Sequence, residues 1–132
     1  MVTEHRNELN ERIDKIEAAY EYMLAYAAQG IESSVGTTQG QEVTAFLHDI
    51  ETALDGLAGV VTAVAEAKNA EVVDTYRSFI DALETDALKT LGAVRLVLAQ
   101  GSISSLLIDN LNASIHLRAL LTDLFVFDEA LK

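Results

Sequence analysis

The feature that most constrains this chain is a helical spacing of apolar residues. In four stretches, large apolar residues follow one another at intervals of three and four, which places them on one face of an α-helix. The second stretch, for example, contains Val43, Leu47, Ile50, Leu54 and Leu57. The spacing predicts amphipathic helices over about residues 3–29, 41–68, 71–99 and 103–131.

The breaks between these stretches carry the usual signals of helix ends. Residues 30–40, rich in Gly, Ser and Thr, form the one long loop candidate, and Thr38 with Gln41 has the spacing of a capping box. Asn69 is the expected N-cap of the third helix. Gly101 is expected to end that helix, because glycine accepts the left-handed conformation common at helix C-termini.

Short connections force neighbouring helices to run antiparallel, so we expect an all-α, antiparallel, up-and-down four-helix bundle. The chain of 132 residues is long enough for one domain, residues 1–132, with a hydrophobic core that needs no disulfide or metal. One alternative stays open at this stage. A long helical hairpin could complete its core by dimerising or by exchanging helices with a second copy.

Small residues form a second row on the helix expected over residues 41–68. Gly56, Gly59 and Ala63 belong to this row, and each glycine inside a helix costs about 1 kcal/mol relative to alanine. Close approach of another helix would offset that cost, and a local kink is the alternative explanation. These three residues are therefore candidates for an interface.

The helix expected over residues 103–131 has apolar residues on well over half of its circumference. Its second apolar row adds four candidate interface residues, namely Leu107, Leu111, Leu121 and Phe125. A helix of this kind is central in the monomer or buried between subunits. We therefore expect self-association, most simply as a homodimer.

Charge divides the chain into two parts. The net charge is −12, and all of it belongs to residues 1–86, which hold 17 acidic and 5 basic residues. Residues 87–132 hold 4 of each and are neutral. The acidic excess argues against direct binding of nucleic acid or of an anionic membrane surface.

No stretch predicts a membrane span, since the longest uncharged run, residues 96–108, is shorter than the roughly 20 residues that a bilayer requires. The N-terminus also lacks the basic and apolar regions of a secretory signal, so a cytoplasmic location is expected. The chain has no cysteine, which excludes disulfides, thiolate metal sites and a cysteine nucleophile.

The sequence carries few candidate reactive groups. The Glu-x-x-His spacing of di-iron bundles is absent, and the reversed pairs His5 with Glu8 and His48 with Glu51 are expected far apart. Neither His48 nor His116 has the neighbours of a phosphotransfer histidine. We therefore expect a protein without catalytic activity, metal or cofactor.

Arg95 and Arg118 lie among leucines, and with Asn110 they form the candidate pocket for a small ligand. Ion pairing is the simpler interpretation. If the last two expected helices turn near residue 101, Arg118 lies opposite residues 84–86 and Arg95 lies opposite Asp109.

Three functions follow as hypotheses. The first is a non-enzymatic module that acts through protein–protein association, as a homodimer, adaptor or regulator. The second is a bundle that holds a small apolar or anionic molecule, using Arg95 or Arg118 with the tyrosines, which are Tyr20, Tyr22, Tyr26 and Tyr76. The third is an acidic inhibitor that mimics nucleic acid and binds a basic protein.

Overall fold

The computed structural model describes residues 2–132, with the side chains of residues 4–71 and 73–132. Within this range about 80% of the chain is helical and no strand occurs, which confirms the all-α prediction. The helices are α1 (Val2–Ala27), α2 (Thr38–Leu54), α3 (Leu57–Asn69), the 3₁₀ helix η1 (Ala70–Val72), α4 (Arg77–Leu98), α5 (Ser105–Asn112) and α6 (Ile115–Ala130).

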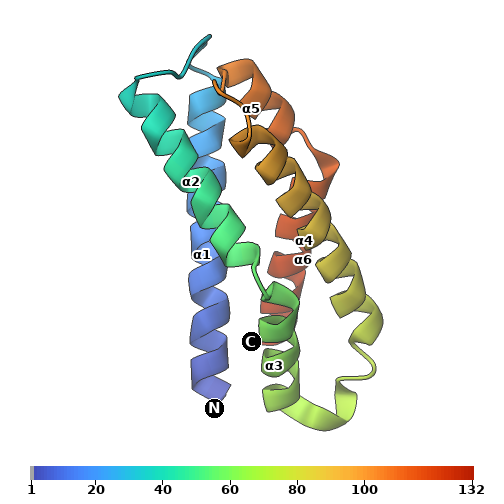
Figure 1. The fold of residues 1–132 in the computed structure, drawn as a ribbon. Coiled ribbons are helices and arrows are strands. Elements are labelled where there is room, and N and C mark those ends of the chain that lie inside the picture. The colour runs from blue at the N-terminus through green and yellow to red at the C-terminus, as the bar shows by residue number, and fades with distance from the viewer. Residues whose placement is uncertain (1) are drawn as a thin grey trace.

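The helices lie roughly parallel to one long axis (Figure 1). α1 and α4 run in one direction, whereas α2, α3, α5 and α6 run in the other. α1 packs against α2, α3 and α5, and α4 packs against α2, α3 and α6. No described helix is long and apolar enough to cross a membrane.

The predicted apolar spacing accounts for the core. The apolar row of the second predicted helix is buried along its length, from Val43 to Leu57. The row of α1 is also buried and includes Leu9, Ile13, Ile16 and Met23. The helices come together because this spacing gives each of them one apolar face, and burying those faces removes apolar surface from water.

The second expected helix is broken, which corrects the prediction of one helix over residues 41–68. α2 ends at Leu54, Asp55 is extended, and Gly56 has φ = +69°, a left-handed conformation that favours glycine. Arg12 of α1 donates to the carbonyl oxygens of Ala53, at 3.2 Å, and Asp55. The guanidinium thus bonds carbonyl groups that the break deprives of helical partners.

Close helix approach does not explain the two glycines. A Cβ atom placed on Gly56 or Gly59 would meet no atom within 4 Å beyond their immediate surroundings in the helix. Gly56 is required by its backbone conformation instead, which is the kink alternative. Gly59 is exposed inside α3, and nothing in the described part of the chain explains it.

The other expected helix ends also need correction. The helix expected over residues 103–131 is interrupted after Asn112, and α6 starts beyond Ser114, whose hydroxyl accepts from the backbone N–H of His116 at 3.3 Å. Asn69 is an N-cap as predicted, but it caps η1, and α4 begins only at Arg77. At Asn69 and at Ser114 a side-chain oxygen accepts a hydrogen bond from a backbone N–H group and so allows a new helix to begin. Apolar spacing does not reveal such starts.

Two smaller predictions on helix ends are also corrected. Thr37, one residue before the predicted Thr38, caps α2 by accepting from the N–H of Gly40 at 2.9 Å. α4 ends at Leu98, before the predicted stop at Gly101.

Hydroxyl groups join the two loops at the end of the bundle where α1 finishes. Tyr26 is fully buried, and its hydroxyl donates to the carbonyl of Ile103 at 2.5 Å. The Ser105 hydroxyl donates to the carbonyl of Tyr26 at 2.7 Å and accepts from the N–H of Ile31 at 2.8 Å. These bonds attach the start of α5 to the end of α1.

The two glycines at the break allow a paired test. Gly56→Ala should destabilise the protein by about 1 kcal/mol, because an L-residue is strained at φ = +69°. Gly59→Ala should stabilise it by about 0.5–1 kcal/mol, because this helical position has open space for a methyl group. Urea unfolding of both variants checks the pair, and equal effects would contradict the assigned roles.

Candidate functional site

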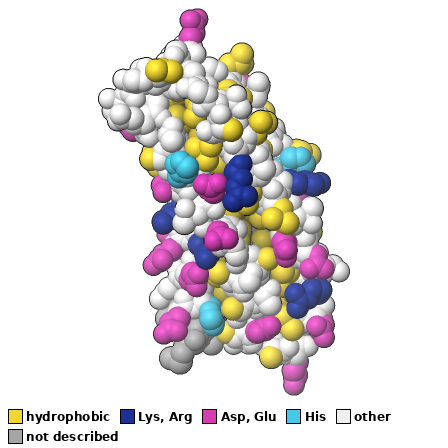
Figure 2. All heavy atoms as spheres, viewed as in Figure 1, with side chains coloured by type: hydrophobic (Ala, Val, Ile, Leu, Met, Phe, Trp, Pro, Cys, Tyr) yellow, Lys and Arg dark blue, Asp and Glu magenta, His cyan; other side chains and the backbone are white. Residues whose placement is uncertain are grey.

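The candidate site is an apolar surface on the neutral part of the chain. The large apolar side chains that stay exposed in the described structure are Leu24, Val35, Leu88, Leu96, Leu106, Ile115, Phe125 and Val126. Six of these eight belong to residues 87–132, the stretch with no net charge. Figure 2 shows hydrophobic side chains reaching the surface over α4 and α5, whereas acidic side chains spread over α1, α2 and the start of α4.

Helical geometry groups these side chains on the outer faces of α4 and α6. Leu88 and Leu96 are eight residues apart, and Ile115 and Val126 are eleven apart, so each pair lies on one side of its helix. The exposed fractions are 60% and 65% for the first pair and 73% and 52% for the second. Exposed apolar side chains grouped in this way mark contact surfaces more often than scattered ones do.

A hollow of about 180 Å³ opens between the beginning of α4 and the end of α6. Its lining is almost entirely apolar and consists of Tyr76, Phe79, Val126, Phe127, Ala130 and Leu131. The rings of Phe79 and Phe127 stack with their centroids 6.4 Å apart. The hollow therefore adjoins the exposed side of α6 through Val126.

The predicted interface residues of α5 and α6 differ in how far they are exposed to solvent. Leu111 and Leu121 are only 5% and 6% exposed and belong to the core, so a second subunit cannot reach them. Phe125 is 47% exposed. Leu107 is half-buried against the core.

The burial of Leu111 has a physical cause. The predicted row assumes one continuous helix, whereas the break after Asn112 separates α5, which packs on α1, from α6, which packs on α4. On the earlier elements, Gly56 and Gly59 are exposed and Ala63 is half-buried.

Sequence reasoning missed the exposed residues of α4. Leu88 and Leu96 do not belong to the buried face of that helix, which contains Ala87, Val94 and Val97. The signal was present in the sequence, because an apolar residue that falls outside the apolar stripe of an amphipathic helix is expected to face solvent.

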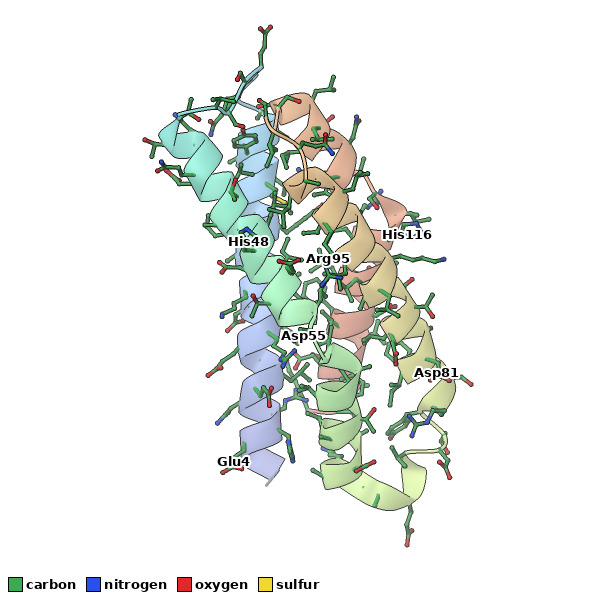
Figure 3. All side chains as sticks on the ribbon, viewed as in Figure 1. Glu4, His48, Asp55, Asp81, Arg95 and His116 are labelled. Carbon is green, nitrogen blue, oxygen red and sulfur yellow. The ribbon has the colours of Figure 1, made fainter. Side chains whose placement is uncertain are left out.

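The three residues of the predicted ligand pocket lie on three different helices, α4, α5 and α6. Arg95 is 61% exposed at its side chain, and its Nε donates to Glu51 Oε2 of α2 at 3.0 Å. Figure 3 shows Arg95 beside α2, close to His48, while His116 lies on α6. Asn110 and Arg118 are exposed on α5 and α6, and neither they nor Arg95 line the hollow described above.

Glu51 is the ion-pair partner that sequence reasoning missed, because Asp109 was expected opposite Arg95. The Glu51 carboxylate also lies 3.1 Å from Nδ1 of His48. Its pKa is lowered, first by the hydrogen bond from Arg95 and second by the one from His48. The α2–α4 contact supplies this pairing, and no spacing within a single helix could have revealed it.

Asp86 lies opposite another acid. The pKa of Asp123 on α6 is raised to about 7, first by burial and then by a hydrogen bond to Asp86 and by its charge. Arg118, which was expected to pair with residues 84–86, is exposed and forms no hydrogen bond or ion pair with Asp86 in the described structure.

The tyrosines proposed as ligand contacts have separate surroundings. Tyr26 is tied to Ile103 in the core, and Tyr22 stacks on Phe46 with centroids 4.5 Å apart. Tyr76 lines the hollow, and Tyr20 is half-buried against the core. Among the residues that the structure describes, no group of three or more metal-ligating side chains lies together.

Comparison with known proteins gives no match to a family model, a curated protein or a solved structure.

The pairing of Arg95 predicts a specific titration. In the Arg95→Gln variant the pKa of Glu51 should rise toward its ordinary value, because the larger of the two lowering contacts is removed. His48→Gln is the matched control and should raise that pKa by a smaller amount. Carboxyl-carbon NMR measures both, and an unchanged Glu51 titration in Arg95→Gln would show that the pair does not form in solution.

Proposed function

We propose that this protein is a non-enzymatic helical module that acts by association, and that two copies meet through residues 87–132. The observation that carries the proposal is the concentration of exposed apolar side chains there, six of the eight among the described residues. Burying such side chains against a partner is favourable by about 25 cal/mol for each Å² of apolar surface removed from water.

The charge distribution favours a second copy as the partner. Each chain carries a net charge of −12, all of it from residues 1–86. Contact through the neutral part keeps the two acidic parts apart and limits their repulsion, which acts over about 10 Å at ordinary ionic strength. A basic partner would be attracted to the acidic part instead, whereas a neutral apolar surface suits another surface of the same kind.

We infer further that the six helices act as the four columns of an antiparallel, up-and-down bundle. In this interpretation α2 with α3 forms one column and α5 with α6 another, while α1 and α4 are single helices. The contacts of α1 with α2, α3 and α5, and of α4 with α2, α3 and α6, support this arrangement. The outer sides of α4 and α6 then form one continuous face for the second copy.

Binding of a small apolar molecule is the second candidate. The observation in its favour is the hollow of about 180 Å³ beside Phe79 and Phe127. A compound that enters it should raise the melting temperature, because a ligand that binds only the folded state stabilises that state. Ala130→Leu should fill the hollow and abolish the increase.

Association through residues 87–132 predicts a difference between two leucines. Leu96→Glu places a carboxylate in the proposed contact and should weaken the dimer about thirtyfold or more, since burying an uncompensated polar group costs roughly 2 kcal/mol. Leu24→Glu is the matched control, because Leu24 is also exposed, at 48%, but lies on α1 in the acidic part. Size-exclusion chromatography with light scattering over a concentration series gives the mass of each species.

The expected result is a dimer for the unchanged protein and for Leu24→Glu, and a shift toward monomer for Leu96→Glu. A strictly monomeric unchanged protein at about 100 μM, a concentration at which a dimer with micromolar Kd would be mostly formed, would refute self-association. Dissociation by Leu24→Glu alone would move the interface to the acidic part.

A further inference from the structure

We propose that Asp86 and Asp123 share a single proton at neutral pH, and that the resulting hydrogen bond joins α6 to α4. Loss of the proton under alkaline conditions would leave two facing carboxylates and loosen this side of the bundle. The pair is thus a pH-sensitive element of the fold, and it is independent of the proposed association.

The packing of α4 and α6 brings the two groups to neighbouring levels of antiparallel helices, because Phe79, seven residues before Asp86, stacks on Phe127, four residues after Asp123. Asp86 lies on α4 and Asp123 on α6, both side chains are half-buried, and the helices pack against each other beside the stacked rings of Phe79 and Phe127. Asp123 Oδ2 has no exposed surface and no donor among the described residues. Its hydrogen-bonding neighbour is the Asp86 carboxyl, which as a carboxylate only accepts.

One proton resolves this conflict. A protonated carboxyl donates an O–H···O bond to the ionised one, and such charge-assisted bonds are among the stronger hydrogen bonds in proteins. Two carboxylates that share a site raise the pKa of one of them, and burial acts in the same direction. Both causes operate at Asp123, where burial is the larger.

Other charged groups on the packed helices do not replace the proton. On α1, Arg6 is already bonded to Asp128 at 2.6 Å. Lys89 on α4, Arg118 on α6 and Asp109 on α5 are exposed, and His116 of α6 is half-buried. None of these groups forms a hydrogen bond or ion pair with Asp86 or Asp123 within the described part of the chain. On the other two helices that pack against α4, His48 of α2 lies against Glu51, and Lys68 of α3 donates to the carbonyl of Lys132 at 2.9 Å. Among the described residues, no cation is therefore in place to neutralise a doubly ionised pair.

The sign of the pH effect follows from linkage. Between the ordinary pKa of 3.8 and the value of about 7 in the folded protein, the folded state holds a proton that the unfolded state has lost. Stability from this pair is therefore fully present below pH 3.8, falls as the pH rises through about 7, and stays level above that. Most surface carboxylates are already ionised across the upper part of this window.

The experiment is urea unfolding at pH 5 and pH 8 of the unchanged protein, Asp123→Asn and Asp81→Asn. The side-chain amide that Asp123→Asn introduces would donate N–H to Asp86 at every pH, so the pH dependence should largely disappear. Asp81→Asn removes one charge from an exposed position of α4 and serves as the control.

We expect the unfolding equilibrium constant of the unchanged protein and of Asp81→Asn to rise about tenfold or more from pH 5 to pH 8, as a pKa difference of one or more implies. For Asp123→Asn we expect a much smaller rise. Parallel pH dependence in all three proteins would overturn the proposal.

Carboxyl-carbon NMR of the unchanged protein gives a second readout that requires no substitution. Asp123 should titrate near pH 7, well above the ordinary range of an aspartate, because burial and the neighbouring Asp86 carboxyl both raise its pKa. Titration of every aspartate below about pH 5, near the ordinary range, would also overturn the proposal.

Discussion

The structure depends on burying aliphatic side chains between helices, while the few polar residues buried among them donate hydrogen bonds to the backbone. Three polar residues are buried in the described part of the chain, and each donates to a backbone carbonyl. Thr90 bonds to Asp86 at 2.8 Å, Ser105 to Tyr26 at 2.7 Å and Asn112 to Met23 at 3.0 Å. Two of these bonds join α5 to α1, so the core can stay apolar while the short helix is held in one position. An unbonded donor in the same place would cost roughly 1–3 kcal/mol.

The same apolar core determines where the charges can lie. Ionised groups are excluded from it, so the acidic residues occupy the outer faces of α1, α2, α3 and the beginning of α4, where they meet water. The second part of the chain has few charges to place on its outer faces, and leucine, isoleucine, valine and phenylalanine remain there instead. The two proposals follow from this partition. The neutral face suits a second copy. Asp123 is half-buried on α6, and its hydrogen-bonding neighbour in the described part of the chain is another acid, Asp86.

Apolar spacing predicted the helical class and most of the buried face, because each helix face depends on residues close together in sequence. It did not predict the break at Gly56 or the one after Asn112. The apolar rows continue across both breaks, and only the backbone conformation at Gly56 and the hydroxyl of Ser114 end the helices there. The pairing of Arg95 with Glu51 was missed for a different reason. It depends on which helices become neighbours, and that arrangement comes from packing of the whole chain.

Hydroxyl-radical footprinting of the unchanged protein, at concentrations well above and well below the dimer dissociation constant, tests the central claim most directly. The proposed association predicts that Leu96, Ile115 and Val126 lose reactivity when the protein is concentrated, while Leu24 on the acidic part stays equally reactive at both concentrations. Protection of Leu24 without protection on α4 and α6, or reactivity that does not change with concentration at any of these side chains, would contradict it.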